Sequence, residues 1–198
     1  MSRCMRKISL LCFSVTLFFS CSNKEKYGSS LYSIDSLLTA QVKYLSENKA
    51  ALTKETRLGD KHDKISFTPK DTLAWKKELE MFAALDIINK PVNKDLYQIE
   101  SLADDKSNLR VKAFTAKTEL PVKYLRIYYQ QAPDKIRKIE AQFNESNSLY
   151  ESSRSLTMEF HQVDNKTVLT SYAIAGGQKM FLADSVQYKI SGALSISN

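Results

Sequence analysis

The chain has 198 residues, of which 43% are hydrophobic, and it contains only five glycines and four prolines. This length and composition exclude a disordered or collagen-like chain and suit one globular domain that folds on its own core. The formal net charge is +7. Arg3, Arg6 and Lys7 supply three of these charges and no acidic residue precedes position 21, which leaves a modest +4 for the rest of the chain.

The N-terminal stretch has the parts of an export signal in the usual order. Its basic residues come first, residues 8–19 are largely apolar, and the small Ser20 precedes Cys21. The apolar stretch is shorter than the roughly 20 residues of a membrane-spanning helix, and polar residues follow at once. We therefore expect residues 1–20 to be a signal peptide that is removed.

This arrangement resembles the signal of bacterial lipoproteins, with Leu17-Phe18-Phe19-Ser20-Cys21 at the place of the lipobox. Phe18 stands where that family usually carries leucine. The resemblance implies a diacylglycerol and an N-acyl group on Cys21, no other cofactor, and a lipidated tether over residues 21–30. Ser22 replaces the aspartate that marks inner-membrane retention, so the resemblance implies a Gram-negative outer-membrane anchor. We expect the periplasmic face, with the cell surface as the alternative.

The residues for several kinds of chemistry are missing from the expected mature chain. Cys4 and Cys12 leave with the signal and Cys21 is acylated, which removes thiol nucleophiles, disulfides and cysteine metal sites. Neither His62 nor His161 has a partner at metal-ligand spacing, and no G-x-S-x-G motif occurs. We therefore expect no catalytic and no metal site, and the export signal disfavours nucleic acid as a partner.

Residues 31–95 are expected to be mainly helical. A first helix is predicted by an apolar stripe that begins after Ser30. Lys54 to Lys64 is dense in charge and contains Gly59-Asp60, so it is expected to be an exposed loop. A second helix is predicted from Thr68-Pro69 to Asn89-Lys90-Pro91. The first stripe consists of Leu31, Ile34, Leu38, Val42, Leu45 and Leu52.

From residue 96 to 198 the apolar residues alternate with polar ones, which predicts an antiparallel sheet. Turns are expected at residues 104–106, 144–148 and 164–166, and at Gly176-Gly177, where both glycines can take positive φ. Since such short turns cannot make parallel crossovers, consecutive strands should form a meander. The strand runs include Leu125, Ile127 and Tyr129, then Leu156, Met158 and Phe160, and finally Val186, Tyr188 and Ile190.

Together these elements predict an α+β fold in one domain, residues 31–198. Two N-terminal amphipathic helices should pack on a curved, half-barrel-like antiparallel β-meander and fill its concave side. This element order is loosely similar to the half-barrels of periplasmic lipoprotein carriers and their outer-membrane receptors. That likeness implies acyl chains held between sheet and helices.

Candidate binding residues fall into two groups. Tyr124, Arg126 and Tyr128 place aromatic and cationic groups on one strand, a mixture that suits sugars, phosphates or a protein partner, although tyrosine is also a common strand residue. Met158, Phe160 and Tyr188 would line a lipid cavity, or equally a dry core.

A third group carries a short modification pattern. Ser36, Thr72 and Ser185 each follow an aspartate and precede an apolar residue. This resembles an O-glycosylation acceptor of some Gram-negative lineages. Asp-Ser and Asp-Thr are also ordinary turn and cap residues.

The sequence thus predicts an outer-membrane-anchored lipoprotein that is a non-catalytic binding or scaffold protein of the cell envelope. Its partners would be the membrane, through the lipid, and an envelope protein, glycan or lipid. The alternative is a carrier that binds lipid or another apolar ligand between sheet and helices. A packed interior with an exposed aromatic patch favours the scaffold, and an apolar cavity favours the carrier.

Overall fold

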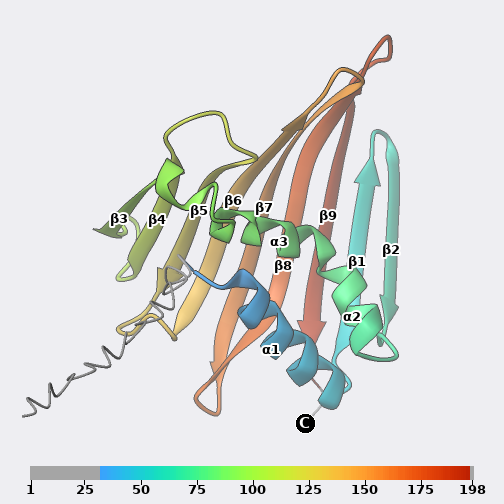
Figure 1. Ribbon diagram of the computed structural model, residues 1–198. Coiled ribbons are helices and arrows are strands. Elements are labelled where there is room, and N and C mark those ends of the chain that lie inside the picture. The colour runs from blue at the N-terminus through green and yellow to red at the C-terminus, as the bar shows by residue number, and fades with distance from the viewer. Residues whose placement is uncertain (1–31, 197–198) are drawn as a thin grey trace, which may run out of the picture.

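The computed structural model describes residues 32–196, so the signal peptide, Cys21 and the tether lie outside the described residues. Nine antiparallel strands form one sheet in the order β2-β1-β9-β8-β7-β6-β5-β4-β3 (Figure 1). The strands are β1 (Ala51–Leu58), β2 (Lys61–Phe67), β3 (Tyr97–Ala103), β4 (Arg110–Ala116), β5 (Val122–Tyr129), β6 (Ile136–Ser146), β7 (Tyr150–Val163), β8 (Lys166–Met180) and β9 (Val186–Ser195). The antiparallel meander predicted for the C-terminal half is confirmed.

The helical segments all lie on one face of this sheet (Figure 1). They are α1 (Ile34–Glu47), α2 (Thr72–Glu78), α3 (Glu80–Ala83) and two 3₁₀ turns, η1 (Ala84–Asn89) and η2 (Lys94–Leu96). The side chain of Ser33 caps α1 by accepting from the amide of Ser36, and Asp71 caps α2 by accepting from that of Ala74. Such caps satisfy amides that the first helical turn leaves free.

The predicted fold class, two N-terminal helices packed on a meander, is wrong, because the N-terminal part also contributes two strands. Residues 51–67 form the β1–β2 hairpin, which pairs with β9 and extends the sheet. The expected exposed loop, 54–64, is therefore strand on both sides of the Gly59 turn, where φ is +56°. The second predicted helix is divided into α2, α3 and η1.

The core lies between the helices and the face of the sheet that they cover. Alternate residues of every strand from β4 to β8 join residues of α1, α2, α3 and η1 in one cluster. Trp75 of α2 and Phe82 of α3 are fully buried there, and the Phe82 ring meets that of Tyr172 edge-on at 5.8 Å. From β4 to β8 the helices thus cover the apolar side of the strands, and the polar side faces away from them.

The β6–β7 and β8–β9 hairpins extend beyond the helices at the top of Figure 1. Gly176 and Gly177, predicted to form a turn, lie instead inside β8, opposite Arg154 and Ser153 of β7. A Cβ on Gly176 would meet the backbone carbonyl oxygen of Ser153 at 2.5 Å, so the glycine allows a close approach between strands. The turn predicted at 164–166 is confirmed, with positive φ at Asp164 and Asn165.

Candidate functional site

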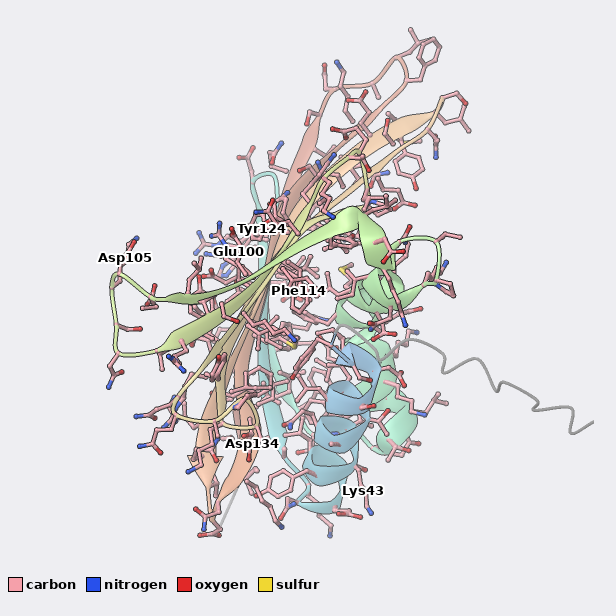
Figure 2. All side chains as sticks on the ribbon, turned by 60° about the vertical axis from the view of Figure 1, so that its left-hand side comes forward. Lys43, Glu100, Asp105, Phe114, Tyr124 and Asp134 are labelled. Carbon is pink, nitrogen blue, oxygen red and sulfur yellow. The ribbon has the colours of Figure 1, made fainter. Side chains whose placement is uncertain are left out.

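The face of the sheet turned away from the helices is called here the open face. Figure 2 shows Phe114 of β4 on the helix side, whereas Glu100 of β3 and Tyr124 of β5 lie on the opposite side. The turn between β3 and β4, which carries Asp105, also projects to the open side. Because side chains alternate along a strand, burial of Leu125 and Ile127 under the helices turns the three predicted β5 residues to the open face.

Tyr124, Arg126 and Tyr128 are brought together with two residues of β6, Lys138 and Glu140, into what we call the β5–β6 cluster. Arg126 pairs with Glu140 across the strands, and Tyr128 pairs with Lys138. The Arg126 guanidinium lies 4.7 Å from the ring centroid of Tyr124, and Lys138 Nζ lies 4.3 Å from that of Tyr128. Both distances suit cation–π interactions, so the predicted mixture of aromatic and cationic groups is present.

Glu140 is the acceptor at the centre of this cluster. Tyr128 Oη donates to Glu140 Oε2 at 2.7 Å, and Lys138 Nζ lies 2.9 Å from Oε1. Partial burial opposes ionisation of Glu140, but these hydrogen bonds outweigh it and lower the carboxyl pKa. Burial, helped by the hydrogen bond to Glu140, raises the pKa of Tyr128 to about 12.

Accessibility divides the three predicted β5 residues. Tyr128 is only 7% exposed, because its ring packs with Val111 and Ala113 of β4 in a small cluster on the open face. Arg126 is exposed and Tyr124 is half-buried. Tyr128 therefore supports the surface, while Arg126 and Tyr124 can contact a partner.

Arg126 belongs to one row of directly paired residues that crosses all nine strands on the open face. At its centre, Thr157, Ala173 and Ser191 line a depression, together with residues that include Glu55 and Glu159. Sequence reasoning missed this depression because small residues carry no periodic signal and β1 was not recognised as a strand. From β3 to β2 the row consists of Glu100, Ala113, Arg126, Glu140, Thr157, Ala173, Ser191, Glu55 and Lys64.

The two carboxylates that line the depression, those of Glu55 and Glu159, have partners. Lys64 Nζ lies 2.6 Å from Glu55 Oε1, and this contact lowers the pKa of Glu55. Ser171 Oγ donates to Glu159 Oε2 at 3.0 Å. His161, two residues beyond Glu159 on β7, is exposed. The depression thus offers polar groups that these contacts hold in place.

The predicted lining residues of the interior lie in two different environments. Met158 and Phe160 are at most 1% exposed and belong to the core cluster that includes Trp75 and Phe82. Tyr188 on β9 is half-buried and only packs against this cluster from its edge. At Met158 and Phe160 the space between helices and sheet is filled by side chains.

A polar contact also crosses the interface between helices and sheet. Glu78 of α2 accepts from the hydroxyl of Tyr172, and its carboxylate lies 2.7 Å from Lys54 Nζ of β1. Burial, with the hydrogen bond to Glu78, raises the pKa of Tyr172. This contact fixes α2 over β8 and β1.

The predicted modification sites lie in different elements. Ser36 is in the first turn of α1 and Thr72 begins α2, whereas Ser185 lies in the turn between β8 and β9. All three side chains are exposed. Cys21, the predicted lipid attachment site, is outside the described residues.

Residues 32–196 contain neither a membrane-spanning helix nor a cluster of metal ligands. No helix in this range is long and apolar enough to cross a membrane. Nor do three or more histidine, cysteine or acidic residues within it gather as metal ligands would. Comparison of the chain with protein-family models, with curated proteins and with solved structures finds no match in any of the three.

Proposed function

We propose that the mature chain is a lipid-anchored, non-catalytic binding protein of the outer membrane, on its periplasmic face, which holds an envelope protein or glycan on the open face of its sheet. Cys21 would carry the anchor, for which the lipobox-like sequence is the support. Arg126 and Tyr124 would make the first contacts. The observation that carries the proposal is the contrast between the two faces of the sheet.

The helix-covered face is a packed core at Met158 and Phe160, while on the open face the exposed Arg126 lies over the ring of the half-buried Tyr124. A carrier of acyl chains would need room where these two side chains lie. The open face instead presents Arg126, a residue type enriched in binding surfaces, beside a half-buried tyrosine. This contrast favours the binding protein over the carrier.

A photo-crosslinking experiment in intact cells tests the open face. A crosslinking amino acid replaces Tyr124, and a matched control replaces Lys43, an exposed residue on α1, on the helix side of the sheet. We expect a discrete adduct from position 124, none from position 43, and loss of the adduct in Arg126→Glu. Equal adducts from both positions, or none from position 124 and its neighbours on the open face, would contradict the proposal.

The anchor has its own test. Labelled fatty acid should enter the parent chain and not Cys21→Ser, and only the parent should fractionate with outer membranes. Two acyl-bearing groups on one terminus hold a protein far more firmly than a single chain does, so the difference should be large. Equal fractionation of the two forms would remove the anchor from the proposal.

A further inference from the structure

The turns at the far end of the β6–β7 and β8–β9 hairpins expose large apolar side chains. We call Leu149, Met180, Phe181 and Leu182 the apolar tip. Their exposed fractions are 65%, 53%, 71% and 91%. The two turns lie side by side, since the amide of Phe181 donates to the carbonyl of Leu149 at 2.8 Å. Single exposed apolar residues are ordinary, but a contiguous group at a projecting end indicates contact with another phase or molecule.

The backbone holds these side chains in place. Leu182 has φ = +61°, a conformation that leucine adopts rarely and at a cost. The amide of Ala183 donates to the carbonyl of Met180 and closes this turn, while Asn147 Oδ1 accepts from the amides of Leu149 and Tyr150 in the other. No burial within the protein offsets the strain, because Leu182 is the most exposed of the four.

We propose that the apolar tip inserts into the interfacial region of the bilayer that carries the Cys21 anchor. The inference rests on the proposed anchoring for its geometry. The two turns, residues 147–149 and 181–185, contain one charged residue, Asp184. Insertion would therefore depend on apolar contact with lipid and not on attraction to anionic headgroups.

The reach of the tether fits this arrangement. The carbonyl of Tyr32, the first described residue, accepts a hydrogen bond from the side-chain amide of Asn89. Asn89 and Phe143 of β6 line one depression, so the start of the described chain lies near Phe143. Phe143 is level with Gly176 of β8 through the strand pairing, and the six residues from there to Leu182 span about 20 Å. Residues 22–31 can extend to roughly 35 Å. The extended tether is thus longer than the distance along β8 to the tip, so the lipid on Cys21 and the apolar tip can reach the same bilayer.

A bilayer suits this surface better than a second copy or a protein partner. The tip projects beyond the helices (Figure 1), and the depression that Leu149, Met180 and Phe181 help to line holds only about 160 Å³. Four partly exposed side chains offer much less than the roughly 800 Å² per partner that a specific protein interface buries. Insertion into lipid needs no matching surface.

Fluorescence quenching tests the insertion. In the lipidated mature chain an introduced cysteine would be the only free thiol, because Cys4 and Cys12 lie in the predicted signal and the thiol of Cys21 is acylated. Leu182→Cys and, at the other end of the β7–β8 hairpin, Asn165→Cys are labelled with an environment-sensitive dye. Both proteins are reconstituted into phosphatidylcholine vesicles containing spin-labelled lipid.

We expect a blue shift and at least about twofold stronger quenching at position 182 than at 165, unchanged by added salt. Equal quenching at both positions would overturn the proposal. So would a blue shift that depends on protein concentration without vesicles, because it would assign the tip to a second copy. A dye at 182 that stays in a polar environment in vesicles would exclude insertion.

A second variant separates the tip from the anchor. With Cys21→Ser, the unacylated chain should still bind these vesicles weakly, and adding Phe181→Asp and Leu182→Asp should reduce the bound fraction about tenfold. Both substituted residues are exposed, so folding should be preserved. In the chain with Cys21 intact, quenching at 182 with no fatty acid incorporated would retain the tip and remove the anchor, whereas acylation without quenching at 182 would do the reverse.

Discussion

Gln41 of α1 and Leu169 of β8 are joined by a buried hydrogen bond, in which the Leu169 amide donates to Gln41 Oε1 at 2.8 Å. Gln41 Nε2 donates in turn to the carbonyl of Thr167 at 2.8 Å. One side-chain amide therefore satisfies two backbone groups next to the point where the β7–β8 register shifts, between Glu159 and Phe160. The irregular pairing provides the free backbone groups that hold α1 in place.

Gln41→Leu should destabilise the protein by about 1–3 kcal/mol, because it leaves the Leu169 amide buried without a partner. Urea unfolding followed by circular dichroism measures the change. Thr39→Ala, on the exposed side of the same helix, is the control and should alter stability by no more than about 0.5 kcal/mol. Equal stability of the Gln41→Leu and parent chains would mean that this contact does not fix α1.

Phe160→Ala tests whether the interior is packed. This side chain is 1% exposed in the core cluster, so its truncation should cost about 3–5 kcal/mol. Ile65→Ala on β2, where the side chain is 47% exposed, is the control and should cost much less. If Phe160 instead lined a lipid cavity, the truncation would be tolerated and lipid would co-purify with the parent chain, which mass spectrometry would detect.

The meander could be predicted because the helices cover one face of it. Leu156, Met158 and Phe160 are buried and the polar residues between them are not, so the sequence alternates between apolar and polar residues. The β1–β2 hairpin lacks that signal, because every residue of β2 is exposed and the pairing of β1 with β9 joins distant parts of the chain. Its sequence is rich in charge and has no apolar periodicity, a pattern that is typical of an exposed loop.

The candidate sites divide in the same way. Tyr124, Arg126 and Tyr128 were placed on one face by the period of the strand. The depression around Ala173 and Ser191 has no such signature, since it depends on small residues from separate strands. The sequence does not predict the apolar tip, because Gly176-Gly177 favours a turn that lies instead inside β8. The apolar run Met180-Phe181-Leu182, which ends two residues before Asp184, was the available signal.

Tyr128 should make stability depend on alkaline pH. Its folded-state pKa of about 12 exceeds the ordinary tyrosine value of 10.0, so the folded state holds the phenol proton more tightly. The resulting stability is fully present below pH 10 and is lost as the pH rises through about 12. Tyr128→Phe should flatten the fall of stability in this window and remove one late-titrating phenol from the absorbance titration. An unchanged titration curve would contradict the buried contact with Glu140.

Gly192→Ala should disturb the contact between α2 and the sheet. Gly192 of β9 lies under the Tyr172 ring, and a Cβ there would come within 2.2 Å of a ring carbon. The ring would have to move away from Glu78, with a cost of about 1–3 kcal/mol for overpacking. Ser191→Ala, the adjacent position on the open face, is the control and should have little effect. Unfolding in urea measures both.

The smaller side chain in Tyr172→Leu removes the ring that a Cβ at position 192 would strike. Adding Gly192→Ala to this variant should therefore cost much less than adding it to the parent chain, because residues in contact are energetically coupled. The double-mutant cycle should give a coupling of about 0.5–3 kcal/mol. Additive effects would show that glycine is required at position 192 for a reason other than the space that the Tyr172 ring occupies.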